Sequence, residues 1–344
     1  MRILLLGHPV LAPALRGLGH DVFTVGTMGA HDILLRSPVN GRGLHERLAS
    51  RGFAPDIVVY MDDGNLPFVD GIEEAGVPLL FYSVDTFCNP WHVSFAHAFD
   101  VVCVAQKDYI PIFADSGHAP LWLPLFCRVA TEPVTVDEWL EARDIPVSFV
   151  GTLKPRNIPD RLPFLKAFAR QCPLFCRQGD FVPVFRRSRI VLNQTAALEI
   201  NFRCFESMGC GAALLTDGAG HGLRELFTPG RDILPPYRRG DVASAVAGAE
   251  RWLSRPRELA EIALAGLGKV TAAHTDVARA REIVALCRGI RPDALERRRE
   301  TLPVRRKHIR AAYGAIVAEL PPECEQHRAF YLHLAAKYGE VIRR

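Results

Sequence analysis

Short apolar runs that alternate with helix-length segments constrain the fold of this chain more than any other feature. In the first third of the sequence they read RILLL (2–6), DVFTV (21–25), DIVVY (56–60), PLLFYSVD (78–85) and DVVCVA (100–105). Because these runs are apolar on both faces and are separated by helix-length segments, they predict parallel strands that helices cover on both sides. The pattern therefore predicts a doubly wound α/β domain.

A second series of apolar runs follows residues 126–146, which read as a linker: VSFVG (147–151), RIVLN (189–193), AALLT (212–216) and DILPP (232–236). A chain of 344 residues is long enough for two domains, since one domain takes about 100 to 200 residues. We expect two Rossmann-like domains, over 1–140 and 141–290, that face each other across a cleft. A helical tail over 291–344 could pack back on the first domain.

The composition is that of an ordinary globular protein, 49% hydrophobic and 23% charged, which argues against disorder. No apolar run reaches the roughly 18 residues that a membrane-spanning helix needs, and no signal peptide is evident. We therefore expect a cytoplasmic protein. Nine scattered cysteines, mostly inside apolar runs, predict reduced thiols packed as small hydrophobes and not a zinc site.

Positive charge is concentrated in one segment of the chain. The net charge is only +4, but residues 291–310 contain eight Arg or Lys and three acidic residues. This segment has two interpretations: a solvated helix face, or a contact with anionic lipid headgroups or a phosphorylated acceptor. A contact with lipid headgroups would place the protein at the membrane surface.

Ligands of open α/β sheets bind outside the carboxyl ends of the strands. In the second domain these ends lead into TLKPRN (152–157), QTAALEINFR (194–203) and the glycine-rich GAGHG (218–222). Cations and loop amides beside a glycine-rich turn suit a diphosphate. The Glu206 carboxylate suits the paired hydroxyls of a ribose, although charge compensation at a helix N-terminus is the simpler alternative. Together these residues predict a sugar-nucleotide site.

The segment NFRCFESMGCGAALLTD, continued by GLRELFTPGRDI, carries a family resemblance. It resembles the pattern N-x-R-x-F-E-x-x-x-C-G-x-x-x-L-T-D of the spore-maturation-protein-like (CgeB-like) bacterial glycosyltransferases. The resemblance extends to VSFVGTLKPRN and, more weakly, to YSVDTFCNPW, and it covers roughly residues 55–250. It implies the GT-B fold and transfer of a sugar, hexose-like, from a nucleotide-diphosphate donor, without a metal or another cofactor.

The resemblance also implies roles for individual residues of the second domain. Glu206 would bind the ribose, and the backbone at Gly209 and Gly211 would lie near the nucleotide. The donor-side residues further include Gly151, Thr152, Asn157 and Asn201, while Lys154, Arg156 and Arg203 would stabilise the departing diphosphate. One departure concerns Glu199, which precedes Glu206 by seven positions. The E-x7-E spacing of many retaining relatives is therefore absent, and the stereochemical outcome stays open.

The first domain would bind the acceptor. An inverting enzyme needs a base there, and Asp85, His8 and His92 each follow or lie near a strand end. Of these, His8 has the best position, in the first turn, and His92 is alternatively a packed or solvated loop residue. Asp63 is a further acceptor-side candidate, although the pair Asp62 and Asp63 does not form the D-x-D motif of metal-dependent transferases.

Aromatic residues of the first domain have two interpretations. Trp91 and Tyr82 could stack on an acceptor sugar or belong to the core. Nothing in the sequence distinguishes a sugar, a lipid-linked glycan or a protein side chain as acceptor.

Three alternatives compete with sugar transfer. A sugar-nucleotide epimerase can share the two-domain fold, but it would bring further catalytic acids and histidines into the donor cleft. A non-catalytic sugar-nucleotide-binding scaffold could use the basic tail to dock on a partner. A nucleic-acid binder is the least favoured, because the excess charge is confined to one segment without an aromatic-rich RNA motif.

Overall fold

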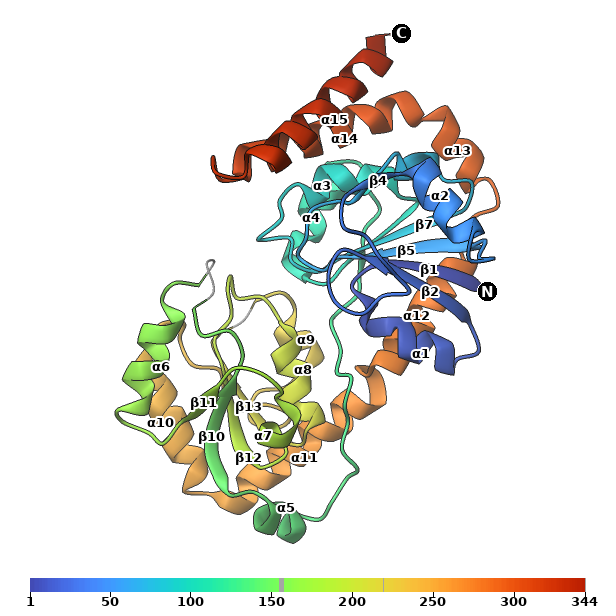
Figure 1. The fold of residues 1–344 in the computed structure, drawn as a ribbon. Helices are drawn as coiled ribbons and strands as arrows, with labels where there is room; N and C mark the ends of the chain where they lie inside the picture. Colours follow the sequence, from blue (N-terminus) through green and yellow to red (C-terminus); the bar gives the residue numbers. More distant parts are fainter. Residues whose placement is uncertain (155–157, 219, 344) are drawn as a thin grey trace. The chain divides into compact units, whose positions relative to one another are not determined.

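The computed structural model describes residues 1–154, 158–218 and 220–343, and their side chains up to residue 339. The chain divides into two compact units (Figure 1). Unit 1 comprises Met1–Leu123 and Ala280–Arg344, and unit 2 comprises Pro124–Arg279. Unit 2 thus begins and ends earlier in the chain than the domain expected over 141–290.

Unit 1 is built on a seven-stranded sheet in the order β3-β2-β1-β5-β7-β8-β9. All of its strand pairs are parallel. The strands are β1 (Arg2–Gly7), β2 (Asp21–Gly26), β3 (Ile33–Leu34), β5 (Ile57–Met61), β7 (Leu79–Ser83), β8 (Val101–Val104) and β9 (Leu121–Trp122). The five longer strands coincide with the predicted apolar runs. Every residue of β5 and β7 is buried, as expected for strands covered on both faces.

Short helices connect these strands, and a small sheet pairs β4 (Val39–Asn40) with β6 (Val69–Asp70). The helices are η1 (Pro9–Leu11), α1 (Ala12–Gly17), α2 (Gly41–Ala49), η2 (Ile72–Glu74), α3 (His92–Phe95), η3 (Ala96–Ala98), η4 (Lys107–Tyr109) and α4 (Ile110–Asp115).

The C-terminal helices belong to unit 1. After α12 (Asp276–Arg288) come α13 (Ala294–Glu300), α14 (Leu302–Glu319) and α15 (Glu325–Arg343). Helix α14 packs against α15, α3 and η3, and Tyr313, Tyr331 and Tyr338 share one hydrophobic cluster with Tyr60 and Phe81 of the sheet. Within the described ranges, no helix combines the length and the apolar character needed to span a bilayer.

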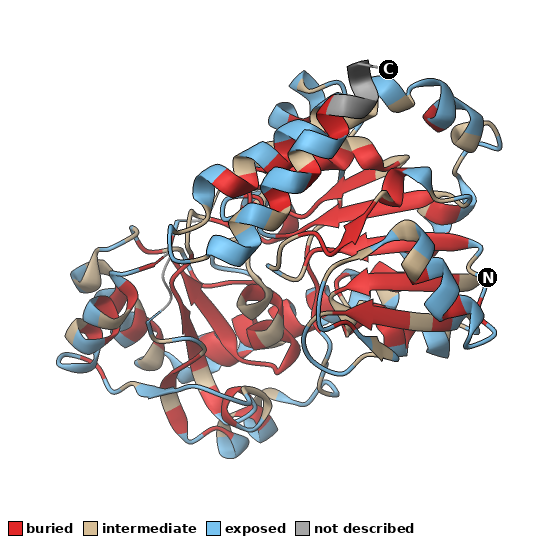
Figure 2. Cartoon of the chain, turned by 45° about the horizontal axis from the view of Figure 1, so that its top comes forward, coloured by how far each residue is buried: buried red, intermediate tan, exposed pale blue. Residues whose placement is uncertain are grey.

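Unit 2 contains a four-stranded parallel sheet in the order β11-β10-β12-β13. The strands are β10 (Ile145–Val150), β11 (Phe175–Arg177), β12 (Ser188–Asn193) and β13 (Ala213–Thr216). The helices are α5 (Val136–Ala142), α6 (Arg161–Ala169), α7 (Val182–Phe185), α8 (Phe202–Gly209), α9 (Leu223–Leu226), α10 (Val242–Leu253) and α11 (Pro256–Ala273). In both units the central strands are buried and the helices expose one face (Figure 2).

The prediction of a strand at residues 232–236 is wrong. Ile233 makes only an isolated bridge to Pro229, although the Leu234 N–H donates to Leu214 O over 3.0 Å. Pro235 and Pro236 have no N–H to continue a ladder, so the segment lies along β13 without forming a strand. The two parallel α/β units nevertheless confirm the predicted fold class.

Candidate active site

The carboxyl ends of β10 and β12 meet the first turn of α8 in unit 2. Asn193, the buried last residue of β12, accepts hydrogen bonds from Arg203 Nη1 over 2.7 Å and from Asn201 Nδ2 over 3.2 Å. Arg203 Nε donates to the Val150 carbonyl at the end of β10 over 3.0 Å. Asn201 and Arg203, both predicted from the sequence, are thus fixed to the end of β12 by Asn193, a residue that sequence reasoning missed, and Arg203 is also fixed to the end of β10.

Gly151 makes room for the guanidinium of Arg203. This guanidinium lies over the Phe149 ring, 4.3 Å from its centroid. A Cβ atom at position 151 would lie 2.1 Å from Arg203 Nη2. Burial lowers the pKa of Arg203, and the Glu206 carboxylate acts in the opposite direction. The strand end therefore requires a glycine where the sequence predicted a donor-binding residue.

Arg161, the first residue of α6, was not predicted as a site residue. Its Nη1 donates to Thr152 O over 3.1 Å and its Nη2 to Gln194 O over 2.9 Å, so it joins the loops after β10 and β12. Burial, followed by the charges of Arg203 and Arg239, lowers the pKa of Arg161 to about 10. Its Nε is buried and has no hydrogen-bond partner among the described residues.

Arg239 lies beside the same loops. Its Nη1 is 3.1 Å from Asp217 Oδ2, and the fully buried Asp217 also accepts from Thr195 Oγ1 over 2.9 Å. The guanidiniums of Arg203 and Arg239 therefore both act on that of Arg161 at one edge of the sheet. Arg161 and Arg239 were missed because their only sequence signal is that each follows a strand or an expected strand, which many arginines do.

The loops after β12 and β13 carry backbone strain. Leu198 and His221 have φ values of 62° and 54°, a region that residues other than glycine rarely occupy. The Gly220 N–H donates to Leu198 O over 3.1 Å and joins the two loops. Strain of this kind costs about 1–3 kcal/mol per residue and is concentrated at functional sites.

Glu206 lies in the second turn of α8, not in the first. Compensation of the helix dipole at its N-terminus therefore does not explain this residue. Burial raises the pKa of Glu206, while Arg203 and Arg128 act against that rise. No described residue donates a hydrogen bond to its half-exposed carboxylate. Its oxygens can accept hydrogen bonds from a ligand.

Packing explains the two glycines that follow Glu206. A Cβ atom at Gly209 would lie 2.2 Å from Cys127 Sγ. Gly211 has a φ of 72° and donates to Met208 O over 2.8 Å, which is the usual left-handed end of a helix. Neither glycine requires a nucleotide nearby to account for it.

The loop after β10 completes the donor-side residues. Thr152 and Lys154 are exposed there. Arg156 and Asn157, which were predicted to bind the diphosphate and the donor, lie outside the described residues.

In unit 1, the predicted acceptor-side residues follow β1, β5 and β7. His8 Nδ1 accepts from the Val10 N–H over 3.2 Å, and Asp63 Oδ1 accepts from the Asn65 N–H over 3.1 Å. Asp85 is exposed in the loop after β7. Desolvation by surrounding protein, followed by the charge of Asp62, raises the pKa of Asp85 to about 6. A carboxyl group with this pKa can exchange a proton near neutral pH.

Trp91, His92 and Tyr82 do not reach the surface of unit 1. Their exposed fractions are 2%, 0% and 0%. The Trp91 ring packs edge-on against His92, with centroids 4.3 Å apart, and Tyr82 Oη donates to Leu123 O over 2.9 Å. The interpretation that these residues contact an acceptor is therefore corrected to a role in the core, because α3 folds the chain back onto the sheet.

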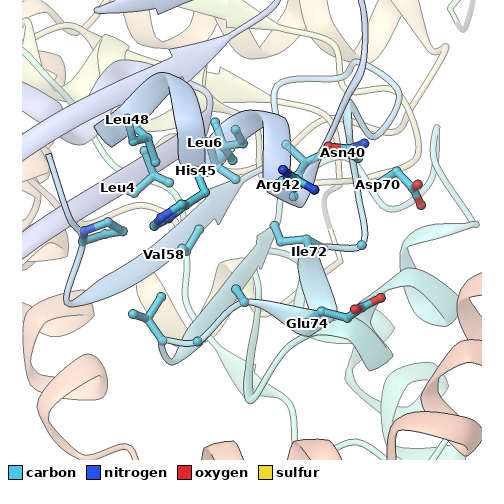
Figure 3. A pocket seen from close by; sticks show the side chains of 18 of the residues that line it. Leu4, Leu6, Asn40, Arg42, His45, Leu48, Val58, Asp70, Ile72 and Glu74 are labelled. Carbon is cyan, nitrogen blue, oxygen red and sulfur yellow. The ribbon is translucent and has the colours of Figure 1, made fainter. Parts of the chain in front are cut away.

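A cavity of about 640 Å³ lies beside α2 in unit 1 (Figure 3). Leu4, Leu6 and Val58 of the sheet face and Ile72 of η2 form its apolar part, and His45 stands at its rim. His8, Asp63 and Asp85 do not line it. The cavity therefore lies on the face of the sheet and not at the strand ends where ligands of such sheets bind.

Metal ligands were not expected from the sequence. Within the ranges that the structure describes, no group of three or more His, Cys, Asp or Glu side chains is arranged to hold a metal ion. All nine cysteines are free thiols.

Residues 139–285, most of which belong to unit 2, match the family described as "Glycosyl transferase-like". No curated protein matches the chain. Among solved structures, a glycosyltransferase from Rickettsia africae is 10% identical with a TM-score of 0.61, and the match covers 84% of this chain and 98% of the other.

Two further structures are each 13% identical to the chain. The first is sucrose-phosphate synthase from Thermosynechococcus elongatus, with a TM-score of 0.61; the match covers 84% of this chain and 98% of the other. The second is Anabaena HepE in complex with UDP, with a TM-score of 0.59; the match covers 83% of this chain and 99% of the other. At these identities the likeness concerns the fold. The chain therefore has the GT-B fold that the sequence predicted.

Proposed function

We propose that this protein is a glycosyltransferase that transfers a sugar from a nucleoside-diphosphate donor to an acceptor hydroxyl. The observation that carries the proposal is the Glu206 carboxylate, which accepts no hydrogen bond from a described residue and lies on the helix that also carries Arg203. An Anabaena protein of the same fold, HepE, is described in complexes with UDP and UDP-glucose. The match of residues 139–285 to the glycosyl transferase-like family supports the same chemistry.

The donor would bind at the carboxyl ends of β10, β12 and β13. The ribose hydroxyls donate to Glu206, as they do to acidic residues in dinucleotide sites. Arg203, Arg161 and Lys154 are our candidates to stabilise the diphosphate, whose negative charge grows as it departs. In this proposal the cations supply the charge that a metal supplies in other transferases.

The acceptor would bind at the strand ends of unit 1. As the bond from the sugar C1 to the acceptor oxygen forms, the bond from C1 to the diphosphate oxygen breaks and the nucleoside diphosphate leaves. An inverting transfer needs a base to take the acceptor proton, and Asp85 is our candidate because its pKa is raised to about 6. The configuration of the product, read by NMR, distinguishes inversion from retention.

The first experiment is a thermal-shift panel of UDP, GDP, ADP, dTDP and CMP on the wild type and on Glu206→Gln. A nucleotide at about 100 times its Kd stabilises the folded protein by about 2.7 kcal/mol, which corresponds to roughly 5–10 °C for a unit of this size. The glutamine keeps the shape but loses the charge-assisted hydrogen bonds. We therefore expect the shift to be largely lost in the variant.

Glu261→Gln is the matched control, since Glu261 is an exposed residue of α11 in the same unit. It should keep the full shift. If no nucleotide raises the melting temperature of the wild type, or if Glu206→Gln responds as the wild type does, the donor site is placed wrongly. Nucleotide binding without sugar transfer to any acceptor would favour a scaffold.

A further inference from the structure

Asp62 holds the loop that carries Asp85. It directly follows β5 and is only 3% exposed. Its Oδ2 accepts hydrogen bonds from the N–H groups of Val84 over 3.3 Å and Asp85 over 2.8 Å, and its Oδ1 accepts from the Gly64 N–H over 2.9 Å. One buried carboxylate therefore fixes the backbone of the loops after β5 and β7.

Asp62 also lies beside the buried ring of His92. His92 Nε2 lies 3.5 Å from Asp62 Oδ1, and His92 Nδ1 lies 2.9 Å from Ser83 Oγ, which contacts Thr86 Oγ1 over 2.7 Å. Burial lowers the pKa of His92, so its ring is neutral near pH 7. The negative charge of Asp62 is therefore not cancelled by His92 and acts on Asp85.

We propose that Asp62 is a positioning residue that fixes the backbone of the loop carrying Asp85. The inference rests on the proposed function and deepens it, because it assigns the position of Asp85, the candidate base, to the buried carboxylate of Asp62. A general base works best when its affinity for protons suits the working pH. Desolvation, followed by the charge of Asp62, brings Asp85 into that range, while the hydrogen bonds that Asp62 accepts hold the loop in place.

The variant that tests this inference is Asp62→Asn in the full chain. Asparagine has the same shape, but one of its two terminal groups is a donor. It cannot accept from Gly64 on one side and from Val84 and Asp85 on the other. It also removes the charge next to Asp85.

The primary measurement is a titration of the Asp85 carboxyl carbon by NMR, which needs no substrate. We expect the midpoint of Asp85 to fall below about 6 but to stay above the ordinary value of about 3.9, because desolvation, the larger cause of the rise, remains in the variant. In turnover assays, the acid limb of kcat/KM should move to lower pH by the same amount. We also expect kcat to fall by about 10²-fold, within the range that general-base catalysis contributes, with the KM for the donor unchanged.

Asp32→Asn is the matched control. Asp32 also accepts a backbone hydrogen bond in unit 1, from the Thr24 N–H over 2.8 Å, but it is not among the groups that shift the pKa of Asp85. The titration of Asp85 should be unchanged in this variant. An Asp85 midpoint that is the same in folded Asp62→Asn and in the wild type would overturn the inference.

A second measurement keeps the inference testable if Asp62→Asn does not fold. In the wild type, the Asp62 carboxyl carbon should show an inflection at the Asp85 midpoint, because the two carboxyl groups interact. Absence of that inflection would also overturn the inference. These titrations decide the role of Asp62 separately from the proposed function, which fails if no donor supports transfer while the titrations come out as expected.

Discussion

Gly151 is the position where a single methyl group tests the arrangement of arginines in unit 2. In Gly151→Ala the added Cβ would lie 2.1 Å from Arg203 Nη2 and 3.3 Å from its Cζ. Because carbon and nitrogen atoms normally stay about 3.5 Å apart, the guanidinium would have to withdraw. The φ of 153° at this residue is also unfavourable for alanine.

Withdrawal would break at least one of the hydrogen bonds that Arg203 donates, to Val150 O over 3.0 Å or to Asn193 Oδ1 over 2.7 Å. A hydrogen bond to a charged group contributes about 1.5–3 kcal/mol. We therefore expect the free energy of unfolding to fall by about 2 kcal/mol. If Arg203 binds the diphosphate, the Kd of the nucleotide should rise by roughly 10- to 30-fold, since each 1.4 kcal/mol is a factor of ten.

Urea unfolding measures the first quantity, and calorimetric titration with the nucleotide that gives the largest thermal shift measures the second. Gly268→Ala is the matched control, because Gly268 lies in α11 and its added Cβ would meet nothing within 4 Å. That variant should gain about 0.5–1 kcal/mol from helix propensity. Wild-type stability and affinity in Gly151→Ala would refute the reasoning.

Two further predictions concern unit 1. Arg298 is 2% exposed and donates to Asp100 and to the Val77 carbonyl, so Arg298→Met should cost about 3–5 kcal/mol by leaving Asp100 buried without its partner. Arg299→Met, at an exposed neighbour, should be nearly neutral, and equal melting of the two variants would contradict this. Because the pKa of Asp85 is raised to about 6, wild-type kcat/KM should fall as the pH drops below 6, and an unchanged acid limb in Asp85→Asn would exclude Asp85 as the base.

Strands were predictable where apolar residues alone define them. The long runs of both units appear as strands within one or two residues of their predicted bounds. The edge strand β11 was missed because all of its residues are exposed and it lacks an apolar run. The run at 232–236 has the composition of a strand, but its prolines remove the N–H groups that pairing needs.

The candidate site was predictable only in part. Glu206 and Arg203 lie within one short motif, so sequence reasoning could find them. Asn193, Arg161 and Arg239 take part because loops distant in the sequence meet at the strand ends; Arg161 and Gln194, for example, are 33 residues apart. Such contacts have no local signal.

The basic segment 291–310 is the opposite case. Its local sequence signal, an excess of positive charge, is clear, but that signal has several explanations. Arg298, Arg305 and Arg306 are engaged within unit 1, with Asp100, with the carbonyls of residues 97 and 99, and with Glu73 and Glu74. Arg291 pairs with Asp293. Fewer charges therefore remain for an anionic surface than the sequence count indicates. Contact with a membrane stays a prediction.

Unit 1 is built from two segments of the chain that lie on either side of unit 2. This arrangement affects the order in which the two units can fold during synthesis. Residues 1–123 leave the ribosome before unit 2, but the helices that complete their core, with Tyr313, Tyr331 and Tyr338, are made after unit 2. All of unit 2 is made in between. Since domains generally fold as units when their residues become available, unit 2 can finish folding before unit 1, and the sheet of residues 1–123 waits until the helices after residue 279 have been made.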